Sequence, residues 1–279
     1  MLIDWHTHLW QPEHFDPAHG AELAARTGAT LDAGPAAHEA GVASVAERFV
    51  ALAMRWKRLD VHVPNAFIAD YVKRFPGRAI GVASVDPHDD DAPEELERAI
   101  TELGLRGLKI SPVYSGFDPW AKEAWRLYEV ADRLRIPIIW HQSAAYATQS
   151  TLEHGNPILL DRIARAFPEL RMIVAHMGQP WIGETVMLLR KHAHVFADLS
   201  ARFHRKWQCY NALMLALDYG VTDKMLFGSD FPVRTTQAAL DEFRAINDWG
   251  EGVTLPRIPE EVIEDIALNR PLELLWPEG

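Results

Sequence analysis

The sequence predicts an α/β fold, specifically a parallel (β/α)8 barrel (TIM barrel), and three observations support this prediction. First, short apolar segments alternate with amphipathic segments of helical length along most of the chain. Second, eight such apolar segments can be counted when the N-terminal one is included. Third, the chain has 279 residues, close to the roughly 250 of a typical barrel domain. A doubly wound open sheet is the competing architecture, but strand number and chain length both favour the barrel. We therefore expect one domain over residues 1–279.

The expected strands are short, continuously apolar runs, as a sheet buried on both faces requires. They are residues 1–10, 48–55, 79–85, 107–110, 137–140, 171–175, 195–199 and 225–227. The intervening segments have helical periodicity and predict the outer layer of helices. These helices are residues 65–75, 94–103, 122–134, 158–167, 184–192, 207–219 and 238–247.

Two regions depart from this alternation. Residues 11–40 contain several Pro and Gly and little periodicity, so we expect a long loop inserted after the first strand, with one helical turn over residues 21–26. Such a loop would lie at the mouth of the barrel, where long loops often act as lids. Residues 259–275 predict a C-terminal helix packed outside the barrel.

Composition narrows the class of partner. The formal net charge of −11 argues against nucleic acid, because binding phosphates requires a basic surface. The single Cys209 excludes an intrachain disulfide and suits a reducing compartment. We see no export signal and no apolar run of about 18 residues. The expectation is a cytoplasmic protein that acts on a small molecule, with homo-oligomerisation left open.

The strongest functional signal is His6-Thr7-His8 at the end of the first strand. Alternate residues of a strand point to the same side, so the two imidazoles aim at one point and suit a metal ion. Three later strands also end in side chains that bind metals, namely His141, His176 and Asp230. Each has an ordinary alternative, as a structural histidine or a turn aspartate. Because catalytic groups of such barrels lie at the C-terminal ends of the strands, we expect all five to converge there.

These motifs resemble the amidohydrolase superfamily, in particular its second large family. The resemblance is carried by residues 6–10 (His-Thr-His-Leu-Trp), by His141 and His176, and by residues 228–232 (Gly-Ser-Asp-Phe-Pro). Residues 84–87 and 107–109 add to it, and it extends from Ile3 to about Leu275. The family includes decarboxylases of aromatic acids and semialdehydes, lactonases and other metal-dependent hydrolases.

The resemblance implies a site with one divalent ion. Its ligands would be His6, His8, His141 and Asp230, and His176 would bind the water or the substrate. Three imidazoles and a carboxylate suit zinc with an open position for water, although Mn²⁺ or Fe²⁺ would also fit. Asp230 would take a proton from the attacking water, and His176 would polarise the substrate or orient the nucleophile. Lys109 is ambiguous, because a modified lysine on the fourth strand bridges two metals in other branches. We expect a single metal, with Lys109 in an ion pair or facing an anionic substrate.

Other side chains are candidates for contact with the substrate. Four aromatic residues follow strand ends, where they would hold a flat molecule and exclude water. They are Trp10, Tyr114, Tyr146 and Trp181. Arg202 and Arg234 each follow a strand end and could bind a carboxylate through two hydrogen bonds. His204 is similarly placed, but the sequence assigns it no role.

Three functions remain open at this point. The first is hydrolysis of a small lactone or related cyclic ester by metal-activated water, which the opening motif and the Gly-Ser-Asp-Phe-Pro motif favour by resemblance. The second is non-oxidative decarboxylation of an aromatic or unsaturated acid at the same site. The third is a metal-binding barrel without catalysis, which is disfavoured because no expected site residue is missing.

Overall fold

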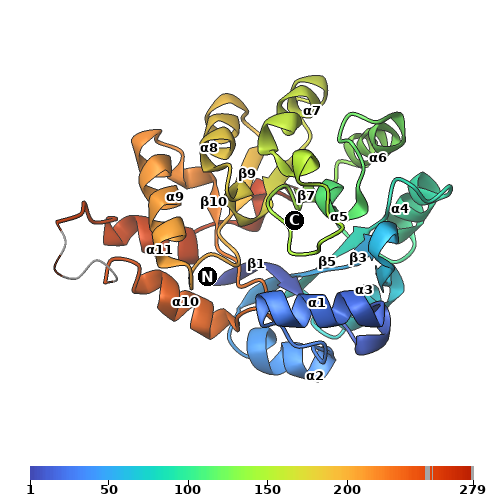
Figure 1. Ribbon diagram of the computed structural model, residues 1–279, viewed down its shortest axis with the longest axis horizontal. Coiled ribbons are helices and arrows are strands. Elements are labelled where there is room, and N and C mark those ends of the chain that lie inside the picture. The colour runs from blue at the N-terminus through green and yellow to red at the C-terminus, as the bar shows by residue number, and fades with distance from the viewer. Residues whose placement is uncertain (249–251, 253, 278–279) are drawn as a thin grey trace.

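The computed structural model describes residues 1–248, 252 and 254–277, and its centre is the predicted barrel (Figure 1). Eight parallel strands lie side by side in chain order. They are β1 (Ile3–His8), β2 (Arg48–Leu52), β5 (Ala79–Ser84), β6 (Leu108–Ile110), β7 (Ile138–Trp140), β8 (Met172–Val174), β9 (Val195–Asp198) and β10 (Met225–Leu226). Each overlaps one of the predicted segments, so the fold class is confirmed.

The last strand returns to the first, which the alternation of the sequence alone does not guarantee. Trp5 N donates to Phe227 O at 3.0 Å, and His8 N donates to Phe231 O at 2.9 Å. Gly228 permits this approach, because a Cβ atom at that position would lie 2.9 Å from the Cβ of His6. These contacts exclude the open doubly wound sheet.

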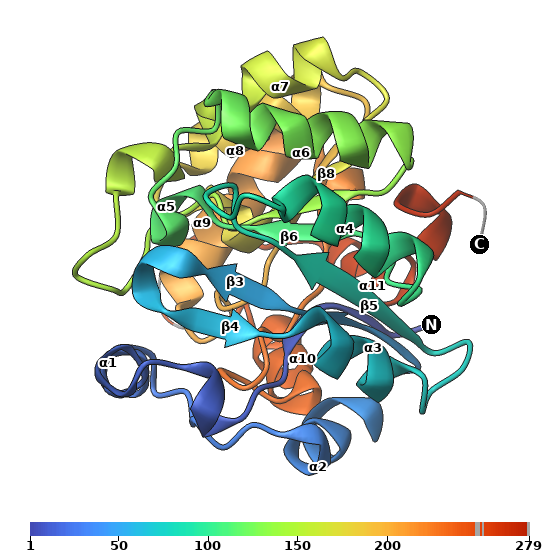
Figure 2. The same ribbon diagram turned by 90° about the vertical axis from the view of Figure 1, so that its right-hand side faces the viewer.

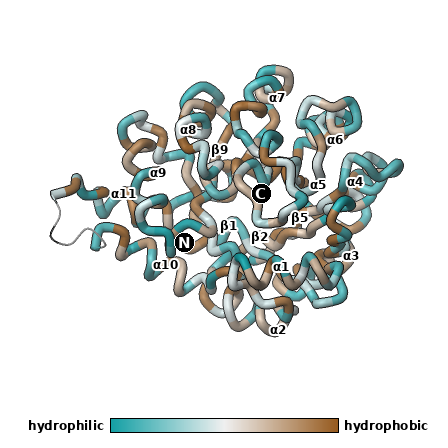
Figure 3. The backbone as a smooth tube through the Cα atoms, viewed as in Figure 1, coloured by the Kyte–Doolittle hydropathy of each residue, from teal (hydrophilic) through white to brown (hydrophobic). Residues whose placement is uncertain are grey.

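Helices surround the barrel, and the hydrophilic residues of the tube lie mostly on their outward turns (Figure 3). The helices that connect successive strands agree with prediction to within a few residues at each end. They are α3 (Asn65–Val72), α4 (Ala92–Thr101), α6 (Lys122–Arg133), α7 (Leu160–Ala166), α8 (Ile182–Lys191), α9 (Lys206–Asp218) and α10 (Thr236–Arg244). Among the described residues, no helix has the length and apolarity needed to cross a membrane.

The barrel interior is filled by inward-facing apolar side chains from the strands. This inner cluster is closed from below by the C-terminal segment, whose Trp276 stacks on Trp5 with ring centroids 6.2 Å apart. Trp276 also donates from Nε1 to Arg106 O at 2.5 Å. The inner cluster contains Ile3, Trp5, Val50, Leu52, Ile80, Val82, Ile139, Ile173, Phe196, Leu226, Leu272, Leu275 and Trp276. The C-terminal segment therefore fills this end of the barrel interior.

The loop predicted for residues 11–40 is wrong in detail. The segment contains the 11-residue helix α1 (Pro17–Thr27) and the short helix α2 (Pro35–His38). Asp16 caps α1 by accepting from the N–H groups of residues 18 and 19, Pro17 opens it, and Gly28 ends it with φ +73°. The predicted insertion is present, but local capping residues make it helical.

A hairpin and a short helix were not predicted, and the predicted C-terminal helix is shorter than expected. The expected second strand ends at Leu52, and the chain continues into an antiparallel hairpin of β3 (Met54–Trp56) and β4 (Val61–Val63). A short helix, α5 (Pro112–Ser115), follows β6. The expected C-terminal helix stops early, as α11 (Glu260–Leu268), and a 3-10 turn follows over Leu272–Leu274. Figure 2 shows α1, the hairpin and α5 together at the end of the barrel opposite the two termini.

Candidate metal centre

A bulge in β1 directs the histidine pair into the barrel. Ile3 and Trp5 point into the inner cluster, so strict alternation would place Thr7 inside and the histidines outside. The pairing of β1 with β2 shifts register between Asp4 and Thr7, and Thr7 instead donates outward to Val50 O at 2.7 Å. His6 and His8 therefore both face the barrel mouth, as bulges beside functional sites commonly arrange.

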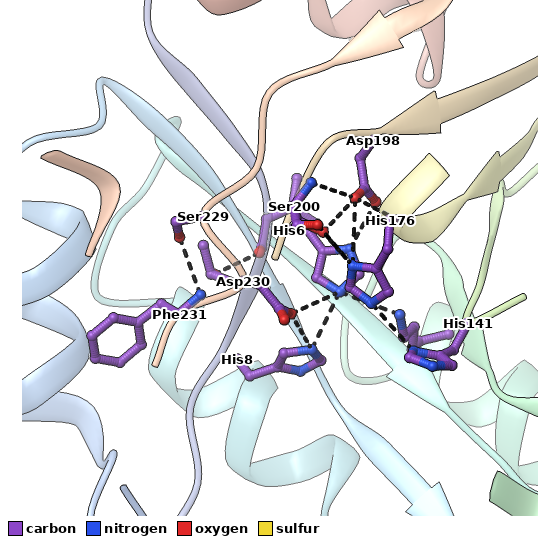
Figure 4. A network of polar contacts seen from close by, with 12 residues as sticks. His6, His8, His141, His176, Asp198, Ser200, Ser229, Asp230 and Phe231 are labelled. Carbon is purple, nitrogen blue, oxygen red and sulfur yellow. Dashed lines mark hydrogen bonds and ion pairs between the residues drawn. The ribbon is translucent and has the colours of Figure 1, made fainter. Parts of the chain in front are cut away.

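The two histidines meet the carboxylate of Asp230. The Nε2 atoms of His6 and His8 lie 3.2 Å apart, and each is 3.5 Å from Asp230 Oδ1. One ligand atom from each of these three residues lies within 4.8 Å of the others, a grouping that could hold a metal ion. Figure 4 shows the rings and the carboxylate converging from β1 and the segment after β10.

His141 and His176 form a second pair beside the first. His176 Nε2 lies 3.3 Å from His141 Nδ1, and the His6 and His176 ring centroids are 5.0 Å apart. Among the described residues, a second set of possible ligand atoms within 4.8 Å of one another comes from His6, His176 and Asp198. His141 belongs to neither set. The predicted ligand His141 is thus adjacent to the centre, with His176 as its nearest imidazole partner.

Asp198, at the end of β9, holds both histidine pairs in place. Its Oδ2 atom accepts from His6 Nδ1 at 2.8 Å. Its Oδ1 atom accepts from the backbone N–H groups of His176 and Ser200, each at 3.0 Å, and from the Ser200 hydroxyl. The Ser200 hydroxyl in turn accepts from His176 Nδ1 at 2.8 Å. A carboxylate behind a ligand imidazole fixes both its tautomer and its orientation.

These outer hydrogen bonds leave unshared electron pairs facing inward. Because His6 and His176 use Nδ1–H as donors, their Nε2 atoms are acceptors. His141 donates from Nε2 to Ala144 O at 3.1 Å, so its Nδ1 is an acceptor as well. The electron pairs of three imidazoles and the Asp230 carboxylate therefore face one space, into which the ammonium of Lys109 also points, 3.3 Å from His6 Nε2. Such a donor set fits a cation.

Burial keeps the imidazoles of His8, His141 and His176 neutral. It lowers the pKa of His8 to about 4 and that of His176 to about 3, and it holds the pKa of His141 well below its usual range. Burial alone would raise the pKa of Asp230, but contacts with His176 and His8 outweigh it and hold this pKa well below the usual range. Neutral imidazoles and an ionised carboxylate are the forms that bind a metal ion.

Lys109 points into the same space from the middle of β6. Its side chain is 1% exposed, and Nζ lies 3.3 Å from His6 Nε2. Burial lowers its pKa to about 8, opposed by the carboxylates of Asp198 and Asp230. The structure thus places Lys109 within the centre, close enough to Asp198 and Asp230 for their carboxylates to act on its charge.

Two of the residues have unusual backbone conformations. Asp230 has φ +58° and His176 has φ +57°, in the left-handed region that few non-glycine residues adopt. The chain turns sharply immediately after each strand, which sends these side chains into the barrel mouth. Backbone strain of this kind is concentrated at functional sites.

A pocket of about 460 Å³ opens above these groups. Among the predicted substrate contacts, Trp10, Tyr114, Tyr146, Lys109 and Arg202 line it. Trp181 and Arg234 are not among its described lining residues, and Arg234 instead pairs with Glu242 at 3.0 Å. The roof comes from α1 and the hairpin, which contribute Leu23, Arg26, Met54 and Trp56.

Several site residues were missed by sequence reasoning. Asp198 could have been predicted, because it stands at the end of an apolar strand, as His141 and Asp230 do. Trp56 stacks on Tyr114 with ring centroids 4.3 Å apart, but nothing local predicted the hairpin that positions it. His204, left unassigned from sequence, lines the pocket.

Comparisons with known proteins agree on the family and the fold. The family model described as amidohydrolase matches residues 3–275. The gamma-resorcylate decarboxylase of Rhizobium radiobacter is 23% identical over 230 residues, which are 65% of this chain and 68% of that protein. A probable 2-pyrone-4,6-dicarboxylic acid hydrolase from Acinetobacter baumannii, with citric acid bound, has a TM-score of 0.66, 17% identity and 99% coverage of both chains. A dihydroxybenzoic acid decarboxylase from Polaromonas sp. JS666, with bound manganese and 2-nitroresorcinol, has a TM-score of 0.62, 17% identity, and coverage of 100% of this chain and 97% of that one.

Proposed function

The chain belongs to the amidohydrolase family, and from this premise we propose that it is a metal-dependent hydrolase that opens a small lactone or related cyclic ester. The observation that carries the proposal is the convergence of His6, His8 and Asp230 at the floor of a pocket large enough for one ring-shaped molecule. The arrangement suits water attack on a carbonyl, because an ionised carboxylate stands beside the position of the nucleophile.

One divalent cation is the cofactor we propose, held by His6, His8, Asp230 and, across the cluster, His141. The inward electron pairs of His6 and His141 support this assignment, as does the position of His8 Nε2, 3.2 Å from His6 Nε2. Nitrogen and carboxylate donors suit Zn²⁺, and Mn²⁺ or Fe²⁺ would satisfy the same set. When bound, such an ion supplies Lewis-acid chemistry, polarising a carbonyl oxygen and acidifying water.

The protein groups divide the remaining work. Asp230 accepts the proton of the attacking water and returns it to the leaving oxygen as the ring opens. His176, held by Ser200 through Nδ1, presents Nε2 toward the reacting centre and orients the water. Lys109 donates to the developing negative charge on the carbonyl oxygen. Trp10 and Tyr114 enclose the ring, and Arg202 stands at the side of the pocket.

The second candidate function is non-oxidative decarboxylation of an aromatic or unsaturated acid. The 23% identical relative is named as a decarboxylase of this kind. The cationic side chain of Arg202 in the pocket wall also favours a carboxylate substrate. Decarboxylation would use the same metal centre, and Asp230 or His176 would deliver a proton to the carbon that loses CO2.

The products decide between these reactions. We would measure metal content by mass spectrometry and screen lactones and aromatic or unsaturated acids while following proton release and CO2 together. Ring opening with one acid equivalent supports the hydrolase, whereas CO2 from an acid supports the decarboxylase. A stoichiometric metal with neither product would contradict both proposals and favour a binding role. Two ions per chain would contradict the single-metal site.

Two variants test whether the centre performs the chemistry. His6→Ala and Asp230→Asn should lose turnover and metal yet keep the circular dichroism spectrum of the parent, because the centre lies above the packed inner cluster. Asp218→Asn, an exposed change on α9, is the control and should leave both properties unchanged. Unfolding of both site variants would contradict the separation of site from core.

A further inference from the structure

One wall of the pocket is formed by basic side chains that follow β9. Arg202, His204 and Arg205 all line the pocket, and they lie two to five residues beyond the strand-end turn at Ser200. No hydrogen bond among the described residues joins these three side chains to the convergent imidazoles, so the wall is separate from the proposed metal centre. The hydrogen bonds of the wall itself indicate what it can bind.

The wall holds donors that lack partners. Arg202 donates from Nη1 to Gln208 Oε1 at 3.2 Å, but its Nε is shielded from solvent and has no acceptor among the described residues. Arg205 donates from Nε to His204 Nε2 at 3.3 Å, so the proton of the neutral His204 ring lies on Nδ1. That Nδ1 is also buried and has no partner in the described part of the chain. Buried donors without acceptors are uncommon in proteins and point to a missing acceptor.

The charges of the side chains that line the pocket also favour an anionic ligand. Of the described residues that line the pocket, only Asp230 carries a carboxylate, and it belongs to the metal centre. Arg202 has no ion pair within the described residues, and its pKa is lowered to about 10 by burial and by Arg205, which Asp230 and Asp198 oppose only in part. Arg26 on the roof is already paired with Glu22 at 3.1 Å. A chain with a net charge of −11 therefore has inside its pocket a basic wall whose arginines form no ion pair among the described residues, which favours entry of anions.

We propose that Arg202, with His204 and Arg205, forms a subsite for a carboxylate of the substrate that does not itself react. The inference rests on the proposed function, since the reacting carbonyl must lie at the His6, His8 and Asp230 floor. The planar guanidinium can hold a carboxylate through two parallel hydrogen bonds. Aromatic side chains enclose the space between wall and floor, so the substrate is a flat ring with a carboxylate at one end and the reacting ester at the other. These side chains are Trp10, Trp56, Tyr114 and Tyr146.

The test is a binding measurement on the metal-loaded protein, which needs no turnover. Benzoate and its neutral analogue benzamide are titrated by isothermal calorimetry, with phenyl phosphate as a third probe. We expect benzoate to bind the parent protein at least 10-fold more tightly than benzamide. Arg202→Met should remove this preference, a loss of about 10- to 100-fold in benzoate affinity, whereas Arg202→Lys should keep part of it. Arg234→Met is the matched control, because that arginine pairs with Glu242 outside the pocket wall, and it should change nothing.

Other outcomes overturn the proposal. If Arg202→Met keeps its metal and its benzoate preference, the carboxylate is held at the floor and the subsite does not exist. Equal affinity of the parent protein for benzoate and benzamide has the same meaning. Tighter binding of phenyl phosphate than benzoate, with the same dependence on Arg202, would replace carboxylate by phosphate as the recognised group.

Failure of this subsite is distinguishable from failure of the proposed reaction. A protein that opens lactones without any dependence of KM on Arg202 keeps the reaction and loses the subsite. A protein that binds benzoate through Arg202 but releases neither acid nor CO2 from the screened compounds keeps the subsite and loses the reaction. If both hold, Arg202→Met should raise KM for a carboxylated lactone about 10-fold or more and leave kcat nearly unchanged, with no effect on the methyl ester of the same compound.

Discussion

Replacing Asp198 by asparagine tests how the centre is assembled, because the change conserves shape and alters only hydrogen bonding. Oδ1 accepts from three donors, the N–H groups of His176 and Ser200 and the Ser200 hydroxyl. The single oxygen of the new carboxamide would remain with these three donors. Its NH2 group would then face His6 Nδ1, where the carboxylate now accepts at 2.8 Å.

The consequence is a change of tautomer at His6. Facing a donor, Nδ1 must become an acceptor, and the proton moves to Nε2, which points at His8 and Asp230. An N–H in that position occupies the electron pair that a metal ion needs. Loss of such an outer partner typically costs 10- to 100-fold in metal affinity, which corresponds to about 1.4–2.8 kcal/mol.

The assay is a titration of Zn²⁺ against a chromophoric chelator, with circular dichroism to verify the fold. Asp218→Asn provides a control with the same chemical change at an exposed position of α9. An unchanged Zn²⁺ affinity in a correctly folded Asp198→Asn protein would refute the reasoning, because His6 would then bind independently of its carboxylate partner.

Three further predictions concern stability and closure of the barrel. Burial lowers the pKa of His38 to about 3 from its ordinary 6.5, so its stabilising contribution is complete above pH 6.5 and is lost as the pH falls toward 3, at about 1.4 kcal/mol per pH unit. In urea unfolding between pH 7 and 5, His38→Gln should therefore show a shallower loss of stability than the parent, and equal slopes would contradict this. Trp276→Ala removes the stack on Trp5 and the plug of the inner cluster, and should lower the free energy of unfolding by about 3–5 kcal/mol; a loss below about 1 kcal/mol would mean that the plug does not stabilise the barrel. Gly228→Ala places a Cβ 2.9 Å from that of His6 and should reduce Zn²⁺ affinity in the chelator assay, whereas normal affinity would show that β10 can shift without disturbing the centre.

The fold was predictable because its determinants are local and repeated. Each buried strand is a short apolar run such as Ile138–Trp140, and each covering helix has one apolar face, so periodicity alone identified the alternation. Only one turn of the helix α1, residues 21–26, was predicted, although the signals for its two ends, Asp16, Pro17 and Gly28, are present in the sequence. The many Pro and Gly residues around it were interpreted as loop signals, while here they mark the two ends of a helix.

The site was only partly predictable, for a different reason. His6 and His8 lie at the end of β1, and three further residues follow apolar strands, namely His141, His176 and Asp230. The barrel brings the ends of its strands together whatever their separation in sequence. Their partners depend on the three-dimensional arrangement. His141 and His176 follow the neighbouring strands β7 and β8, whereas Asp198 at the end of β9 bonds to His6 on β1, with β10 between these two strands. Sequence periodicity does not show which side chains lie at the same height along the barrel axis.

The pocket has a floor built from strand ends and walls built from connecting segments, and this division explains why family membership does not identify the substrate. The floor is built from strand ends and fixed by Asp198 and by the bulge in β1, so its geometry can persist while loops change. The walls and roof come from α1, the β3–β4 hairpin and the segment after β9, which are connections and not barrel strands. A floor of imidazoles and one carboxylate serves ester hydrolysis and decarboxylation alike, so discrimination must reside in those connections. The unpaired donors of Arg202 and His204 require an acceptor, so they indicate one specific feature of the substrate. Substitutions in this wall should therefore change which acid or ester binds, and should leave the chemistry at Asp230 largely unchanged.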